Sequence, residues 1–158
     1  DYYRMFIEVD DKDEAINRLK NIFGIYEIVK CTFITEKALI AICEVAKSLV
    51  EDNQTFKVET NRSDKTYPIK SMDLSKQVGA FLLCNKTNLK VDVHSPNTLL
   101  NIEIRREGVY LYTNGIKGAL GYPSGTLGKA LLMLSGGIDS VVAGFLSIKK
   151  GMEIIELI

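Results

Sequence analysis

The chain has 158 residues, 46% of them hydrophobic and 25% charged, with 20 basic and 20 acidic side chains. This is ordinary globular composition for one or two small domains with a real core. Spanning a bilayer needs about 18 apolar residues in a row, and no run approaches that length. The first residues also carry no basic-then-apolar signal pattern, so we expect a cytoplasmic protein without a membrane span.

The three cysteines, Cys31, Cys43 and Cys84, stand at wide spacings inside apolar runs. An odd number so placed fits neither a disulfide framework nor a paired metal site. We expect buried free thiols.

The zero net charge hides an uneven distribution. Residues 1–54 hold 7 Lys/Arg against 11 Asp/Glu, residues 55–130 hold 11 against 6, and residues 131–158 hold 2 against 3. The basic middle could attract a polyanion such as RNA, but a solvated surface gives the same count.

The first third of the chain predicts alternating strands and helices. It lacks an initiator methionine and begins with alternating apolar residues, as if entered partway through a sheet, so we expect a fragment. Residues 13–23 have one apolar helical face, and Gly24 can end that helix. Residues 26–34 then read as a strand, and Thr35 is a candidate N-cap for a second helix. This order indicates an α/β or α+β fold.

A new unit is expected after the polar stretch 51–54. Its predicted elements are a strand at 55–60, a basic loop at 61–68, a helix capped by Ser71, a strand at 89–95, and two strands within 99–114. The result is a small mixed sheet with helices. The only histidine, His94, follows the alternating strand pattern next to Ser95 and Pro96, which favours a structural role over a catalytic one.

The segment 115–130 is rich in glycine, which is typical of a flexible linker. Part of it superficially resembles a Walker-type phosphate loop. However, Pro123 stands where the first glycine should be, Ala130 stands where Ser or Thr should follow Lys129, and the segment precedes a strand when it should follow one. We therefore exclude a Walker-type site.

The last segment predicts a β-loop-α-β unit. Leu131 to Leu134 read as a buried parallel strand, residues 139–149 as a helix ended by Gly151, and residues 152–158 as a second parallel strand. The intervening loop, SGGIDS, lies at the amino end of the helix, where backbone N–H groups and the helix dipole favour an anion.

Each residue type in this loop suits a phosphate. Gly136 and Gly137 permit close backbone approach and positive φ angles, and Ser135 and Ser140 add hydroxyl donors. Asp139 could cap the helix or hold Mg²⁺. The alternative is a plain strand-to-helix turn with Asp139 or Ser140 as N-cap. A nucleophile elbow is excluded because GxSxG is absent.

These segments carry a resemblance to a known family. SGGIDS resembles the SGGxDS signature of the PP-loop ATP pyrophosphatases, which adenylate an oxygen and release pyrophosphate. Together with TFKVETNRSDKTYP, LKVDVHSP, IEIRREGVYLY and LGYPSGTLGKALLMLSGGIDS, it resembles tRNA 4-thiouridine synthetases, also called tRNA sulfurtransferases, which are thiamine-biosynthesis proteins.

The resemblance implies a fold of mixed α+β and α/β class, truncated at both ends. Residues 1–34 would be the latter part of an N-terminal ferredoxin-like domain, and residues 35–118 a THUMP RNA-binding domain, whose family profile could begin near residue 11. Residues 119–130 would be a glycine-rich linker. Residues 131–158 would begin a PP-loop domain, the first β-α-β of a parallel sheet like that of the adenine nucleotide α hydrolases.

The resemblance also implies an activity. ATP would activate the uridine at tRNA position eight as an adenylate, and persulfide sulfur from a donor such as a cysteine desulfurase would displace AMP to form 4-thiouridine. Sulfur supply to thiamine thiazole synthesis and a homodimeric assembly remain open. The residues implied to hold ATP and its Mg²⁺, with Asp139 as catalytic residue and metal ligand, are Met133, Leu134, Ser135, Gly136, Gly137, Asp139, Ser140 and Ile158.

The THUMP part would bind the acceptor end of tRNA through basic residues near the signature segments. The candidates are Lys57, Arg62, Lys65, Arg105, Arg106 and Lys117, each equally well explained as a solvated surface charge.

The chain also departs from the family pattern. Val141 stands where relatives commonly have proline, and no cysteine matches a sulfur-transfer position, so we expect no sulfur transfer by this chain alone. Two other hypotheses stay open: an RNA-binding THUMP module with an inert PP-loop remnant, and a PP-loop synthetase acting on a small molecule.

Overall fold

The computed structural model describes residues 4–157. The chain divides into two compact units. One is formed by residues 29–114, and the other combines the segment before residue 29 with the segment after residue 114. Both units combine helices with strands, which confirms the predicted mixed α/β class.

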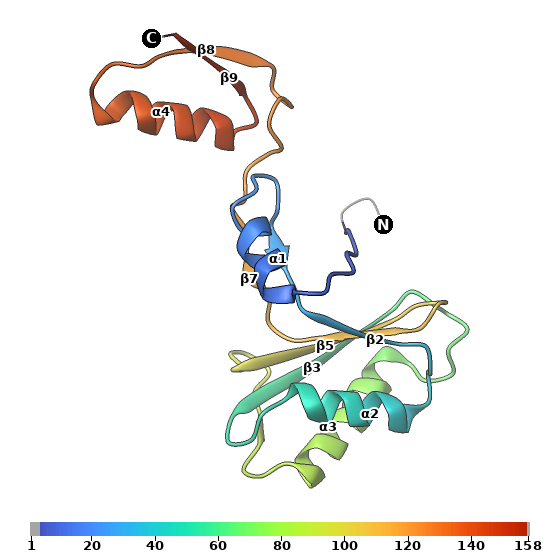
Figure 1. Ribbon diagram of the computed structural model, residues 1–158. Coiled ribbons are helices and arrows are strands. Elements are labelled where there is room, and N and C mark those ends of the chain that lie inside the picture. The colour runs from blue at the N-terminus through green and yellow to red at the C-terminus, as the bar shows by residue number, and fades with distance from the viewer. Residues whose placement is uncertain (1–3, 158) are drawn as a thin grey trace. The chain divides into compact units, whose positions relative to one another are not determined.

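The unit of residues 29–114 is a five-stranded mixed sheet with two helices. Its strand order is β2-β6-β5-β3-β4, with β3 parallel to both β4 and β5, and β6 antiparallel to both β2 and β5. The elements are β2 (Cys31–Ile34), α2 (Leu39–Leu49), β3 (Thr55–Arg62), α3 (Ser71–Asn85), β4 (Lys90–Val91), β5 (Thr98–Ile104) and β6 (Val109–Tyr112). In Figure 1 both helices lie on the same face of this sheet.

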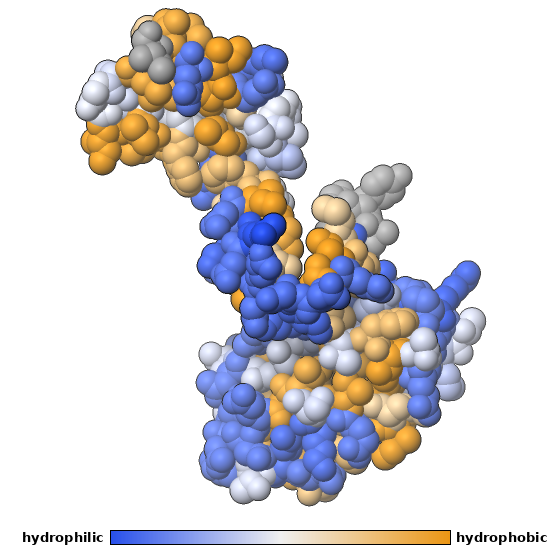
Figure 2. Space-filling model, viewed as in Figure 1, coloured by the Kyte–Doolittle hydropathy of each residue, from blue (hydrophilic) through white to orange (hydrophobic). Residues whose placement is uncertain are grey.

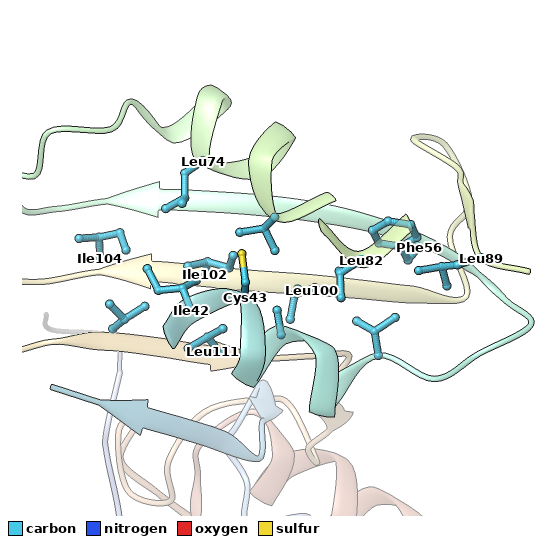
Figure 3. Close-up of a cluster of buried hydrophobic side chains, with 14 of the residues drawn as sticks. Ile42, Cys43, Phe56, Leu74, Leu82, Leu89, Leu100, Ile102, Ile104 and Leu111 are labelled. Carbon is cyan, nitrogen blue, oxygen red and sulfur yellow. The ribbon is translucent and has the colours of Figure 1, made fainter. Parts of the chain in front are cut away.

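The core of this unit lies between the helices and the sheet. The alternation of strand β5 turns Leu100, Ile102 and Ile104 to the helical face, where all three are fully buried. Apolar residues at helical spacing in α2 and α3, among them Ile42 and Leu74, complete the layer (Figure 3). Burying such side chains removes apolar surface from water, which is the main force that holds this unit together.

Several predicted boundaries in this unit were wrong, for tertiary reasons. Thr35 does not cap a helix: α2 begins at Leu39 after Ala38, because the intervening segment is held by contacts of Lys37 described below. Lys70 is the N-cap of α3, and Ser71 is its first helical residue. The strand predicted at 89–95 is shortened to β4 because the Asp92 carboxylate accepts hydrogen bonds from two backbone N–H groups that follow it.

The other unit contains a short helix, a small β-ribbon and a β-α-β segment. Helix α1 (Lys12–Leu19) ends four residues before the predicted boundary, and β1 (Glu27–Ile28) pairs antiparallel with β7 (Ile116–Lys117). Residues 4–9, part of the alternating apolar start, form no strand, and residues 1–3 lie outside the described residues. The predicted strand at 26–34 is thus two strands, of which β2 joins the larger sheet.

The β-α-β segment has the predicted order. Strand β8 (Lys129–Met133) and strand β9 (Glu153–Leu157) pair in parallel, and α4 (Ile138–Lys149) connects them. The only buried residue of α4 is Gly144, where an added Cβ would lie 2.7 Å from Leu132 Cδ2. A side chain is therefore excluded where the helix comes closest to the strand.

The expectation that the first of these strands is buried was wrong for the described residues. Leu131 is 63% exposed and Met133 71% exposed, and Figure 2 shows hydrophobic surface over this segment. A single helix can cover only one face of two paired parallel strands, whereas parallel sheets are normally covered on both faces.

The glycine-rich segment before β8 makes more definite contacts than a flexible linker would. Tyr122 N–H donates to the Lys149 carbonyl at 3.0 Å, and Leu127 N–H donates to the Gly151 carbonyl at 3.0 Å. The segment is thereby tied to the turn between α4 and β9, and its backbone is ordered by partners far along the chain.

All three cysteines are free thiols. Cys43 is buried, where desolvation raises the pKa of its thiol, and Cys31 is half-buried. Cys84 is exposed, so the prediction of burial was wrong there. No helix in the described part of the chain is both long and apolar enough to cross a membrane.

Candidate functional site

The loop between β8 and α4 has open space where a phosphate was predicted. A Cβ built on Gly136 meets no atom within 4 Å, and one built on Gly137 meets only Ser135 Oγ, at 3.8 Å. Neither glycine adopts the positive φ that glycine permits; Gly137 has φ −97° and ψ 155°. What the glycines supply is therefore an unobstructed backbone, not a left-handed turn.

The N-cap of α4 is Gly137, which contradicts the alternative in which Asp139 or Ser140 caps the helix. Among the described residues no side chain bonds the first turn as a cap. The N–H groups of Gly136, Gly137, Ile138 and Asp139 accordingly have no acceptor within the described residues. Unpaired donors at the positive end of a helix dipole are the arrangement that binds phosphate groups in many proteins.

The Ser140 side chain bonds to backbone carbonyls of this loop. Its Oγ lies 3.0 Å from the Gly137 carbonyl oxygen and 3.1 Å from the Ser135 carbonyl oxygen. Ser135 Oγ lies 3.4 Å from Ser140 Oγ. The Ser140 hydroxyl can donate to either carbonyl, and it thereby helps to fix the backbone of the loop.

The carboxylate of Asp139 lies in the exposed first turn of α4. Within residues 4–157 there is no group of three or more His, Cys, Asp or Glu side chains that could hold a metal by themselves. Mg²⁺ commonly takes one or two carboxylates and completes its shell with phosphate oxygens and water, so a single aspartate beside a phosphate loop fits that ion.

The residues predicted to face adenine lie at the end of β8. Met133 is exposed, and Leu134 donates its backbone N–H to the Leu157 carbonyl at 3.2 Å. The third member of that prediction, Ile158, lies outside the described residues.

Three of the six basic candidates form hydrogen bonds or ion pairs with other residues of the chain. Arg62 Nη1 donates to the carbonyl oxygens of Tyr67, at 2.6 Å, and Ile69, at 3.1 Å. Lys57 is paired with Glu59 at 2.6 Å. Arg105, whose side chain is 16% exposed, is paired with Glu103 at 3.2 Å.

The other three basic candidates are exposed, but not on one unit. Lys65 and Arg106 belong to the five-stranded unit, whereas Lys117 lies on β7 in the other unit. The structure therefore brings Lys65 and Arg106 into one domain and leaves Lys117 in another.

One group of interacting polar side chains in the five-stranded unit was not predicted from the sequence. Lys37 Nζ forms an ion pair with Asp64 Oδ2 at 2.9 Å, and Tyr67 donates its hydroxyl to the Lys37 carbonyl at 3.0 Å. Asp64 Oδ1 also accepts from the N–H and the hydroxyl of Thr66. These hydrogen bonds and the Lys37 ammonium hold the pKa of Asp64 well below its ordinary value. The pattern Asp-x-Thr was a local signal for the Asp64 turn, but nothing local indicated Lys37.

The structure combines a mixed five-stranded sheet with a β-α-β segment whose strands are parallel. Two family models match these parts and define the class as a THUMP-containing protein: "THUMP domain" matches residues 37–114, and "Thiamine biosynthesis protein (ThiI)" matches residues 125–158.

Individual relatives define the family. A "Probable tRNA sulfurtransferase" of Clostridium acetobutylicum is 44% identical over 96% of this chain and 39% of its own length. A protein of the same name from a Thermoanaerobacter species is 46% identical over 96% of this chain and 40% of its own length. The chain belongs to the tRNA sulfurtransferase family, and it spans about two fifths of the length of these relatives.

Two solved structures have the same fold. The PH1313 protein of Pyrococcus horikoshii has a TM-score of 0.82 and 30% identity, with 94% of this chain and 50% of that chain covered. A 4-thiouridine synthetase, solved as an RNA complex with bound ATP, has a TM-score of 0.74 and 35% identity, with 95% of this chain and 40% of that chain covered.

Proposed function

We propose that this chain is part of an ATP-dependent tRNA sulfurtransferase that converts the uridine at tRNA position eight to 4-thiouridine. The observation that carries the proposal is the loop of residues 135–139, with four unpaired N–H groups and open space at two glycines, within a chain of this family. The 4-thiouridine synthetase with bound ATP and RNA supports ATP and tRNA as its substrates.

In the proposed reaction, the uridine O4 attacks the α-phosphate of ATP and pyrophosphate leaves. The terminal sulfur of a persulfide then attacks C4, and AMP leaves. A second thiol attacks the inner sulfur of the persulfide, which breaks the S–S bond, forms a disulfide and releases 4-thiouridine. The N–H groups of Gly136 to Asp139 would hold the β- and γ-phosphates and stabilise the charge that develops on pyrophosphate. Ser135 has a hydroxyl that can turn to a phosphate oxygen, whereas Ser140 keeps the loop in shape.

Other parts of the machinery belong to the same proposal. Asp139 would provide the carboxylate for Mg²⁺, which neutralises phosphate charge, and the backbone at Met133 and Leu134 would face the adenine. A cysteine desulfurase would deliver the persulfide in the cytoplasm, where tRNA is modified. We further propose that the protein forms a homodimer and that it supplies sulfur to thiazole synthesis. We also propose domain boundaries at residues 34, 118 and 130.

The test uses the full-length protein with unmodified tRNA, ATP and a persulfide donor. Formation of AMP, pyrophosphate and 4-thiouridine is expected, and Asp139→Ala should abolish all three. Asp73→Ala is the matched control because Asp73 is also an exposed acid in the first turn of a helix, α3. Unchanged thiolation by Asp139→Ala would overturn its role, and tRNA binding without ATP turnover by the wild type would favour an RNA-binding module instead.

A further inference from the structure

The side chain of Asn114 continues the sheet where strand β6 stops. Strands β5 and β6 pair so that Asn101 lies opposite Tyr112, and the same register continued would bring Leu99 opposite Asn114. There the side-chain amide replaces the backbone: Leu99 N–H donates to Asn114 Oδ1 at 2.8 Å, and Asn114 Nδ2 donates to the Asn97 carbonyl oxygen at 2.7 Å. A carboxamide has the same kinds of donor and acceptor as a peptide, so it can extend the ladder. We call these two hydrogen bonds the amide bridge.

Strand β3 holds the acceptor end of the amide bridge in place. Asn97 Oδ1 accepts from both the N–H and the hydroxyl of Thr55, at 3.1 and 2.7 Å, and the Asn97 N–H donates to Thr55 Oγ1 at 3.0 Å. Thr55 is the first residue of β3, which pairs with β5. Because the bridge depends on this pairing, it opens when this end of the sheet opens.

Asn114 is followed by Gly115, and this is the only Asn-Gly pair in the sequence. In such a pair the following backbone nitrogen reaches the asparagine side chain most readily, because glycine has no side chain to hinder the approach and has the greatest backbone freedom. Asn114 is exposed to water, and the Gly115 N–H has no acceptor within the described residues. What opposes a reaction between them is the amide bridge, which holds the carboxamide against β5.

We propose that Asn114–Gly115 is a deamidation site that the amide bridge protects in the folded five-stranded unit, so that its conversion marks molecules in which this end of the sheet has opened. In the reaction the Gly115 nitrogen loses its proton to solvent base and bonds to Asn114 Cγ. The Cγ–Nδ2 bond breaks, and ammonia leaves with a proton from water. Water then opens the cyclic imide at one of its two carbonyl groups, which gives aspartate or isoaspartate. No step depends on ATP or tRNA.

The product cannot re-form the amide bridge. In aspartate an oxygen replaces Nδ2, so a negative carboxylate would face the Asn97 carbonyl oxygen that Nδ2 contacts at 2.7 Å. Two acceptors in contact repel each other, and a carbonyl that loses its donor destabilises the fold. In isoaspartate the main chain between β6 and β7 also gains a methylene group. Each conversion therefore favours the open state of this end of the sheet permanently.

The first experiment measures the reaction in the full-length protein, folded in buffer and unfolded in urea, at the same mildly alkaline pH. Trypsin releases residues 107–117, a peptide in which Asn114 is the only asparagine, so its mass gain and isoaspartate content report on this site alone. The folded protein should react at least about 5-fold more slowly, which is the lower end of the protection that two hydrogen bonds provide. Equal rates, or no reaction in urea, would overturn the proposal.

Two variants test whether the amide bridge controls the reaction. Thr55→Val removes the hydroxyl that holds Asn97, so the folded variant should react about 3- to 10-fold faster than the wild type, the effect of one weakened hydrogen bond. Thr60→Val is the matched control, because it removes a hydroxyl of the same strand that bonds Ser75 instead. In urea all three proteins should react alike. If the two folded variants react equally fast, the amide bridge does not control the site and the proposal fails.

Asn114→Asp tests the consequence of the reaction. Hydrogen exchange of the Leu99 amide should become severalfold faster in this variant, because the bridge that holds it has lost its donor to Asn97. Asn21→Asp is the matched control: Asn21 is also exposed and donates its side-chain amide to a backbone carbonyl, but in the other unit, so exchange at Leu99 should stay as in the wild type. Unchanged exchange at Leu99 in Asn114→Asp would show that the carboxylate still holds β5 and would overturn the proposed marking of opened molecules.

Discussion

Substituting alanine for Gly136 separates the phosphate site from the stability of the fold. A Cβ at this position meets no protein atom within 4 Å, and the backbone does not have a positive φ. The fold should therefore tolerate alanine, with a gain of about 0.4–1 kcal/mol from the reduced entropy of the unfolded chain. The same methyl group would occupy the space where a phosphate must approach the loop N–H groups.

The expected loss in ATP affinity follows from those N–H groups. Losing one hydrogen bond to a charged oxygen costs about 1.5–3 kcal/mol, which corresponds to about a 10- to 150-fold higher Kd for ATP. Titration calorimetry of the full-length protein measures the Kd, and urea unfolding measures the stability.

Gly79→Ala is the matched control for this substitution. A Cβ at Gly79, within α3, also meets no atom within 4 Å. This variant should be more stable by about 0.5–1 kcal/mol and should bind ATP as the wild type does. If Gly136→Ala and Gly79→Ala bind ATP equally well, the loop does not hold phosphate and the reasoning is refuted.

Two further predictions concern stability. Gly151 has φ +93°, and a Cβ there would lie 2.2 Å from Thr126 Oγ1, so Gly151→Ala should destabilise the β-α-β segment by about 2–4 kcal/mol in urea unfolding, from backbone strain and overpacking; a loss below about 1 kcal/mol would contradict this turn geometry. Because the folded state depresses the pKa of Asp64, its stabilising effect is present above the unfolded-state pKa, which is near 3.8, and is lost as the pH falls below it. The urea midpoint of Asp64→Asn should thus fall less than that of the wild type between pH 5 and pH 2, and parallel curves would contradict the role of Asp64.

The β-α-β segment could be predicted because its signals are local. An apolar run, two glycines and an apolar helical face each follow from residues a few positions apart, and short-range backbone geometry turns them into strand, loop and helix. The N-cap of α4 could not be predicted in the same way. Asp139 and Ser140 both have side chains that favour an N-cap, yet Gly137 holds that position, and Ser140 instead bonds the Gly137 and Ser135 carbonyls.

The basic residues illustrate the limit of sequence reasoning more sharply. Arg62 and Lys65 lie three residues apart in the same loop region and looked equivalent in the sequence. In the fold, Arg62 donates to two backbone carbonyls, whereas the Lys65 side chain makes no hydrogen bond within the described residues. A basic side chain has a structural role only if the fold brings acceptor groups next to it, and residue type alone does not predict where those acceptors lie.

The sequence by itself determined the order of helices and strands in the last segment, the position of the SGGIDS loop between strand and helix, and the family, because hydrophobic periodicity and short motifs act over a few residues. Tertiary structure alone decided that Lys37 pairs with Asp64 across 27 residues, that β2 joins the five-stranded sheet, and that the glycine-rich segment is bonded to the end of α4. These contacts depend on which distant segments the packed core brings together, since an ion pair or a backbone hydrogen bond forms only once its partners have been placed within about 3 Å of each other.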